Sequence, residues 1–187
     1  MSTEVIKKRF TVDEYYRMAE AGILRPEDRV ELIDGEIIQM SPIGQRHAAR
    51  VSRATSLFIR AFGEKAVVSP QNPLQLSDWT EPQPDIVVFK ARSGFYESKK
   101  PTPGDVLLVL EISDTTLRYD MKIKLPHFAA ALIPEVWIQD INGDSLHVFR
   151  EPQGNRYVTS MQLKRGDFVH AFAFPEIRFS IDDLLGG

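Results

Sequence analysis

The 187-residue chain contains no cysteine, and it has no run of about 18 apolar residues. The absence of cysteine excludes disulfide bridges and thiolate metal sites, and it fits a reducing compartment. The N-terminal residues 1–8 also lack the apolar core of a signal peptide. These absences predict a soluble cytoplasmic protein without a membrane-spanning segment.

An excess of basic residues is also lacking, because 23 Lys and Arg stand against 26 Asp and Glu, for a net charge of −3. Nonspecific affinity for nucleic acid comes from neutralising phosphates with Lys and Arg. Any contact with nucleic acid must therefore be local or mediated by metal. The sequence has no internal repeat, low-complexity segment or linker, so we expect a single domain over residues 1–187.

The first half of the chain predicts a helix, a β-hairpin and a second helix. Thr11 and Glu14 have the spacing of a capping box, which marks the start of a helix. The pair Asp34-Gly35 is a strong signal for a two-residue hairpin turn. Apolar residues at helical spacing follow, and Gly63 ends them. The predicted elements are a helix over 12–21, strands over 30–33 and 36–40, and a helix over 47–62.

The second half predicts strands interrupted by one helical segment. Pro126 falls inside that segment, so the helix either kinks there or begins later. Asn142-Gly143 lies between two apolar stretches and indicates a hairpin. The predicted elements are strands over 66–68, 86–89 and 106–110, a loop over 93–104, a helix over 118–131, and hairpin strands over 136–139 and 146–149, with further strands and turns from 156.

This order of elements predicts an α/β (α+β) fold. Helices should pack on a mixed β-sheet, with a helix and hairpin at the N-terminus and a second hairpin toward the C-terminus. The strand–helix–strand passage over 111–139 has the form of a right-handed crossover between parallel strands.

Two acids stand at the ends of apolar strands. Asp85 opens the strand over 86–89, and Glu111 closes the strand over 106–110. A carboxylate at the end of a buried strand loses hydration and stays ionised only if a cation compensates. Two such acids that converge make a site for a divalent metal such as Mg²⁺, which takes oxygen ligands. This chemistry serves phosphodiester cleavage, so the acids indicate a metal-dependent nuclease.

Pro84-Asp85, Glu111 and a nearby lysine resemble the PD-(D/E)XK nuclease pattern, although Ser113 occupies the usual place of the lysine. The chain as a whole resembles the Uma-type family of restriction-endonuclease-like proteins over roughly residues 10–185. The matching stretches are residues 29–37, 40–42 with His47 shortly after, 83–88, 110–116, 119–120, 124–126 and 133–138.

The resemblance implies a restriction-endonuclease-like fold and a role for each matching residue. In that family the lysine lies on the helix after the strand, which makes Lys124 the match and accounts for Ser113. Asp85 and Glu111 would ligate Mg²⁺ (Mn²⁺ is also compatible), with the Ile112 carbonyl as a third ligand. Lys124 would hold the attacking water or neutralise the phosphoryl oxygens. Glu31 would be a further ligand or an outer acid.

Several residues have a second interpretation. Lys122 competes with Lys124 for the role of the lysine. Glu31 could instead form a cross-strand pair with Gln39 or a lysine. Asp120 is expected to be a helix N-cap. His47 is expected to pack at the start of its helix, and Trp137 to lie in the core or a dimer surface. One set of arginines on the same helix as His47 is expected to form either a solvated face or a contact with a phosphate backbone: Arg46, Arg50, Arg53 and Arg60.

Two functions follow from this sequence. The first is an Mg²⁺-dependent endonuclease acting on DNA, with RNA or a nucleotide as other possible phosphoester substrates. The second is a nucleic-acid-binding or assembly module that keeps the fold without useful turnover, which the acidic net charge favours. A nuclease with one site per chain usually cuts both strands as a pair of chains, so we expect a symmetric homodimer. The sequence leaves open the recognition sequence and any methylation partner.

Overall fold

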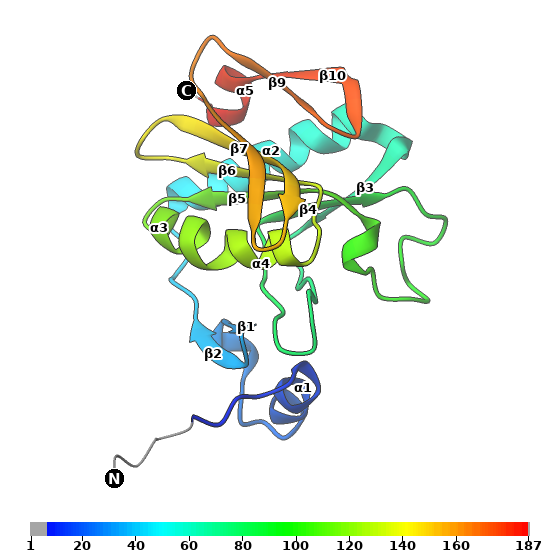
Figure 1. The fold of residues 1–187 in the computed structure, drawn as a ribbon, viewed down its shortest axis with the longest axis vertical. Coiled ribbons are helices and arrows are strands. Elements are labelled where there is room, and N and C mark those ends of the chain that lie inside the picture. Colours follow the sequence, from blue (N-terminus) through cyan, green and yellow to red (C-terminus); the bar gives the residue numbers. More distant parts are fainter. Residues whose placement is uncertain (1–6, 187) are drawn as a thin grey trace.

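The computed structural model describes residues 7–186, and its centre is a six-stranded mixed sheet (Figure 1). The strand order is β3-β4-β5-β6-β7-β8. Only the pair β5–β6 is parallel, as the crossover predicts, and the other neighbours are antiparallel. The strands are β3 (Ala66–Pro70), β4 (Ile86–Lys90), β5 (Val106–Ser113), β6 (Glu135–Asp140), β7 (Ser145–Gln153) and β8 (Arg156–Leu163).

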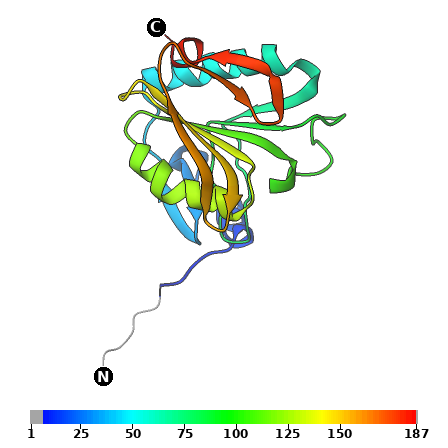
Figure 2. The same ribbon diagram turned by 45° about the horizontal axis from the view of Figure 1, so that its top comes forward.

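Helices cover both faces of this sheet, which confirms the predicted fold class (Figure 2). The α-helices are α1 (Val12–Glu20), α2 (Gln45–Phe62), α3 (Leu117–Tyr119), α4 (Leu125–Ala130) and α5 (Ile181–Leu185). Short turns are the 3-10 turns η1 (Pro26–Asp28), η2 (Gly63–Lys65) and η3 (Pro103–Asp105) and the π turn η4 (Asp120–Lys124). Two separate hairpins are β1 (Val30–Ile33) with β2 (Glu36–Gln39), and β9 (Phe168–Ala171) with β10 (Phe174–Ser180).

The central strands are apolar throughout because both of their faces are buried. Successive strand residues point to opposite faces. Ile86 and Val88 of β4 therefore pack in the cluster that contains α2 and the β9–β10 hairpin. Val87 and Phe89 pack in the opposite cluster, which contains Phe128 of α4. Trp137 lies in the core on the α2 side, which answers the choice between core and dimer surface.

The N-terminal helix and hairpin lie beside the main sheet rather than in it (Figure 1). Both were predicted. Thr11 and Glu14 form the capping box of α1. Asp34 and Gly35 form the two-residue turn of the β1–β2 hairpin, and both have positive φ angles of 51° and 73°. A bridge between Leu32 and Glu81 holds the hairpin to the loop that leads into β4.

The helical segment after β5 continues through Pro126 without ending. It begins at α3, widens into the π turn η4, and continues as α4. Proline lacks an N–H and its ring crowds the carbonyl four residues before it. Just before Pro126, the Leu125 N–H bonds the Asp120 carbonyl five residues back, so the widened turn accommodates the proline. Of the two alternatives, a later start is wrong, because the segment is helical from Leu117 onward; its departure from regular helix is the π turn just before Pro126. Within residues 7–186, no helix is long and apolar enough to cross a membrane.

Candidate active site

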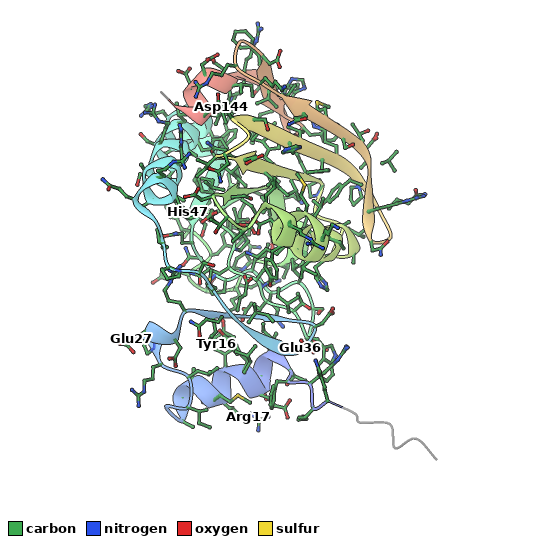
Figure 3. The ribbon with its side chains drawn as sticks, turned by 90° about the vertical axis from the view of Figure 1, so that its left-hand side faces the viewer. Tyr16, Arg17, Glu27, Glu36, His47 and Asp144 are labelled. Carbon is green, nitrogen blue, oxygen red and sulfur yellow. The ribbon has the colours of Figure 1, made fainter. Side chains whose placement is uncertain are left out.

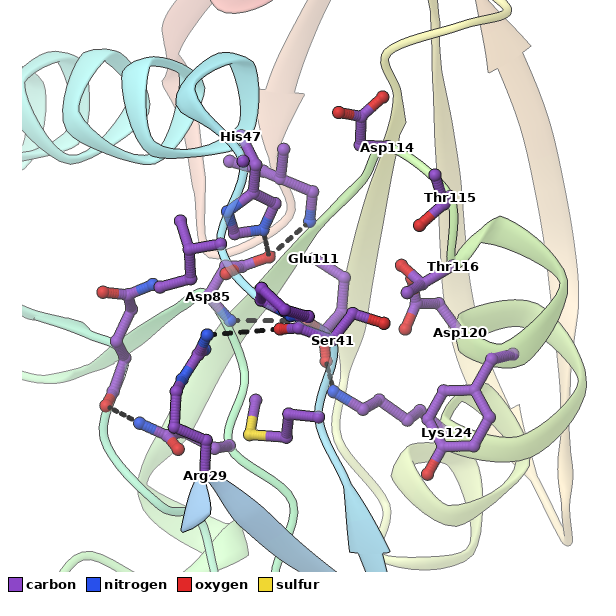
Figure 4. Close-up of a pocket in the computed structure, with 18 of the residues that line it drawn as sticks. Arg29, Ser41, His47, Asp85, Glu111, Asp114, Thr115, Thr116, Asp120 and Lys124 are labelled. Atoms are coloured by element: carbon purple, nitrogen blue, oxygen red, sulfur yellow. Dashed lines mark hydrogen bonds and ion pairs between the residues drawn. The ribbon is translucent and has the colours of Figure 1, made fainter. Parts of the chain in front are cut away.

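A pocket of about 640 Å³ lies at the edge of the sheet where β4 begins and β5 ends (Figure 4). Its walls come from segments that are far apart in the sequence. They are the end of the β1–β2 hairpin with the loop after it, the first turn of α2, the turn after β5, and the helical segment. The predicted residues Asp85, Glu111, Ile112 and Lys124 all line this pocket.

Asp85 and Glu111 meet because β4 and β5 are antiparallel. Ile86 pairs with Leu110, so the next position places Asp85 opposite Glu111 on the same face of the sheet. The Asp85 backbone N–H donates to Glu111 Oε2 at 3.3 Å. The structure thus brings the two predicted acids together at the pocket.

Asp85 also binds the backbone of β5. Its Oδ2 accepts a hydrogen bond of 2.8 Å from the Ile112 N–H. Because the N–H and C=O of a strand residue point to the same neighbour, the Ile112 carbonyl also faces the side that Asp85 occupies. The backbone oxygen predicted as a third ligand therefore lies on the side of β5 that faces Asp85.

Lys124 reaches the acids from η4, on the opposite wall of the pocket. Only 5% of the residue is exposed, and its Nζ lies 3.2 Å from both Glu111 Oε1 and Glu31 Oε2. Burial lowers the pKa of Lys124, but the charges of Glu111, Glu31 and Asp120 outweigh burial and raise it above its ordinary value. Lys122 is exposed, so the structure places Lys124 and not Lys122 at the acids.

Glu31 comes from β1 and is buried. Its carboxylate accepts hydrogen bonds from the Tyr119 hydroxyl at 3.1 Å and from the Gln83 backbone N–H at 3.0 Å. The alternative of a cross-strand pair with Gln39 is wrong, because Glu31 stands opposite Ile38. Glu31 therefore joins the N-terminal hairpin to the lysine of the pocket.

Asp120 is not the helix N-cap that was expected. It is the first residue of η4 and is buried, and its carboxylate accepts hydrogen bonds of 2.7 Å from the Ser113 and Thr116 hydroxyls. Burial raises the pKa of Asp120, while Lys124 and these two hydroxyls lower it. Ser113, which occupies the usual place of the lysine, thus holds an additional acid beside the pocket.

His47 lies at the start of its helix, as expected, and it also lines the pocket, which was not predicted. It lies in the first turn of α2, and its Nε2 is 3.0 Å from Asp85 Oδ2 (Figure 4). The hydrogen bond to Asp85 raises the pKa of His47, and burial partly opposes this shift. Its Nδ1 is buried with no partner among the described residues. The one sequence signal for His47 is its position in the stretch that matches the Uma-type family.

The four carboxyl groups around Lys124 give the pocket an excess of negative charge. Burial raises the pKa of Glu111 well above its usual range; Lys124 lowers it, and Asp120, Asp85 and Glu31 raise it further. Glu111 and Glu31 contact the Lys124 ammonium, Asp120 acts on it through its charge, and Asp85 is hydrogen-bonded to His47. A bound cation would relieve the repulsion.

The oxygen donors of the pocket fit a hard divalent cation. Among residues 7–186, no three His, Cys, Asp or Glu side chains are arranged to hold a metal ion. Mg²⁺, however, commonly takes only one or two carboxylates and completes its shell with water and substrate phosphate. Asp85 and Glu111 supply two carboxylates and Ile112 a carbonyl, so the residues present fit Mg²⁺ or Mn²⁺.

Comparison with known proteins adds a family and a related fold. The family model Uma2, described as "Putative restriction endonuclease", matches residues 12–182. A crystal structure described as a "putative nuclease belonging to DUF820", from Anabaena variabilis, is similar with a TM-score of 0.74. The two sequences are 20% identical, and the match covers 94% of this chain and 97% of that chain. No curated protein matches.

Proposed function

This chain belongs to the Uma2 family, described as "Putative restriction endonuclease", and from that premise we propose that it is a metal-dependent endonuclease that hydrolyses DNA phosphodiester bonds. The observation that carries the proposal is the meeting of Asp85, Glu111 and Lys124 at one pocket. Two carboxylates on one sheet face beside a buried ammonium combine a cation site with a positive charge for a phosphate.

Each residue has a separate task in this proposal. Asp85, Glu111 and the Ile112 carbonyl would hold Mg²⁺ or Mn²⁺. When bound, the cation supplies a Lewis acid for the phosphate and lowers the pKa of a bound water. Lys124 would orient the attacking water or neutralise charge on the phosphoryl oxygens. Glu31 would fix the Lys124 ammonium, because it is the second carboxylate within 3.2 Å of it.

His47 would act as a positioning residue. Its ring holds Asp85 Oδ2, the same oxygen that accepts the Ile112 N–H. Both bonds fix the orientation of the Asp85 carboxylate, as outer partners commonly do for metal ligands.

The experiment is a plasmid-nicking assay in Mg²⁺, in Mn²⁺ and in chelator, together with titration of each metal by calorimetry. We expect nicking only with metal, and its loss in Asp85→Asn and Glu111→Gln. Lys122→Ala is the matched control, because this exposed lysine should not affect cleavage. Nicking that survives in both acid variants would contradict the proposed site.

A second candidate is a nucleic-acid-binding or assembly module without turnover. The observation that favours it is that Lys124 forms ion pairs with both Glu111 and Glu31, so its ammonium serves as their shared counterion. This alternative predicts DNA binding with no nicking in either metal. Nicking by the parent protein in either metal would exclude this alternative.

The proposed activity also implies an assembly and a compartment. One site per chain would cut one strand, so cleavage of a duplex favours a symmetric homodimer. The cysteine-free sequence suits the cytoplasm. Light scattering coupled to size exclusion tests the dimer directly, and a monomer at working concentration would contradict it.

A further inference from the structure

Helix α2 has one strongly basic face. Its 18 residues contain no acid. At 3.6 residues per turn, its four arginines fall within an arc of about 80°. They form what we call the arginine face: Arg46, Arg50, Arg53 and Arg60.

The arginine face is turned to solvent. The buried residues of α2 are Val51, Ala54, Phe58 and Phe62, which lie on the side that packs against the sheet. Of the arginines, only Arg50 is partly buried. Figure 3 shows α2 along one flank of the molecule, with His47 near the end that approaches the site.

Hollows in the surface connect this face to the active-site pocket. One of about 460 Å³ lies between α2 and the end of β3, and Gln71 lines both it and the active-site pocket. A second of about 660 Å³ runs over the arginine face and shares Ser52, Ser56 and Arg60 with the first. A series of adjoining hollows therefore leads from the pocket along α2.

The charge balance of this surface is positive although the chain is acidic overall. Arg46 lies 3.5 Å from Asp114, which lines the active-site pocket, and Asp183 lines the hollow over the arginine face. Burial lowers the pKa of Arg50, and the like charges of Arg53 and Arg165 lower it further. Cations crowd together here without an equal number of acids.

We propose that the arginine face binds the sugar–phosphate backbone of double-stranded DNA beside the bond that is cut. This inference rests on the proposed function, because it assigns the substrate of the same site. Arginine binds phosphate through two parallel hydrogen bonds, and serine hydroxyls such as those of Ser52 and Ser56 add further contacts. From Arg46 to Arg60 the helix rises about 21 Å, which matches roughly six nucleotide steps of one DNA strand.

The test is metal-free DNA binding, measured by fluorescence anisotropy in chelator so that metal-dependent cleavage cannot occur. The probe is a labelled duplex of about 20 base pairs, longer than the roughly six steps that the face spans. The key variant is Arg53→Glu with Arg60→Glu. The control, Lys99→Glu with Arg156→Glu, makes the same charge change at two exposed residues outside α2.

We expect the α2 pair to lose at least about tenfold in affinity and the control pair to stay within about twofold, because contacts with phosphate act locally. In a plot of log affinity against log salt, which slopes downward, Arg53→Ala and Arg60→Ala should each make the slope shallower by about 1. The inference would be overturned if both pairs lost the same affinity, if neither lost affinity, or if the parent did not bind the duplex. It would also be overturned if the alanine variants had the same salt dependence as the parent.

A separate arm keeps this inference distinct from the proposed function. Asp85→Asn should abolish nicking in Mg²⁺ and leave metal-free binding intact. Loss of nicking with retained arginine-dependent binding supports the arginine face. If instead the parent binds DNA through the arginine face without nicking it, the proposed function fails, and of this inference only the DNA contact stands.

Discussion

The charge of this site depends on Lys124, a buried lysine in a cluster of four acids. Lys124 is 3.2 Å from Glu111 and from Glu31, and Asp120 and Asp85 add negative charge nearby. Removal of one partner from a buried ion pair leaves an uncompensated charge, which costs far more than the loss of an exposed pair. At the scale of single residues, Lys124 therefore has a structural task in addition to the proposed catalytic one.

Lys124→Ala should destabilise the protein by about 3–5 kcal/mol, since Glu111 and Glu31 lose their shared counterion. Lys122→Ala should change stability by less than about 0.5 kcal/mol, because Lys122 is exposed. Urea unfolding of the parent, Lys124→Ala and Lys122→Ala measures both changes in the free energy of unfolding. Equal stabilities for the two variants would show that the Lys124 ion pairs contribute nothing, and nicking assays on Lys124→Ala must be run where the variant is folded.

His47→Ala should weaken Mn²⁺ binding by roughly 10–100-fold while the fold persists, because Asp85 loses one of the two partners of Oδ2. His170→Ala is the control, since His170 is exposed. Calorimetric titration gives the affinities, and circular dichroism checks the fold. Unchanged affinity in His47→Ala would reduce this histidine to a packing residue.

Sequence patterns located some of these residues and missed others for physical reasons. Asp85 and Glu111 were found because an acid at the end of an apolar strand is conspicuous. Lys124 was chosen through the family resemblance, because the helix spacing alone leaves Lys122 open. The contact of His47 with Asp85 was not predicted and the role of Asp120 was misjudged, since their partners include residues 38 and 7 positions away that only the folded chain brings together.

At the scale of elements, the local signals were the most informative. The capping box of α1 and the Asp34-Gly35 turn act within a few residues, so both could be predicted. The π turn at η4 could not be predicted, because it depends on how Pro126 and the buried Asp120 and Lys124 fit against the sheet. Asp120 and Lys124 are the first and last residues of this turn.

Thr11→Ala should lower stability by about 1 kcal/mol, because the Thr11 hydroxyl accepts the Glu14 backbone N–H at the start of α1. Glu20→Ala, at the exposed end of the same helix, is the matched control and should be nearly silent. Urea unfolding followed by circular dichroism compares the two variants. A loss no larger than that of the control would mean that the cap does not contribute to global stability.

At the scale of the whole molecule, the charged cluster around Lys124 exists only when three parts of the chain meet. The N-terminal hairpin supplies Glu31, the strands β4 and β5 supply Asp85 and Glu111, and the helical segment supplies Lys124. Folding therefore concentrates like charges at one point, and the stability of the molecule should depend on whether a cation occupies that point.

Glu111→Gln should leave the melting temperature of the metal-free protein unchanged or raise it. The change removes a buried charge repelled by Asp120, Asp85 and Glu31, and Lys124 keeps its pair with Glu31. In the parent protein, Mn²⁺ at about 100 times its dissociation constant should add about 2.7 kcal/mol of stability. For a chain of this length, that corresponds to a rise of roughly 5–11 °C in melting temperature.

Glu111→Gln should lose most of that metal-dependent rise, because one of the two proposed carboxylate ligands is gone. Differential scanning calorimetry of both proteins, with and without Mn²⁺, gives the four melting temperatures. A variant that unfolds without metal would make Glu111 a structural acid. If Mn²⁺ raised the melting temperature of Glu111→Gln as much as that of the parent, the metal would bind elsewhere. The reason is that the clustered carboxylates are the source both of the repulsion at this pocket and of its affinity for the cation.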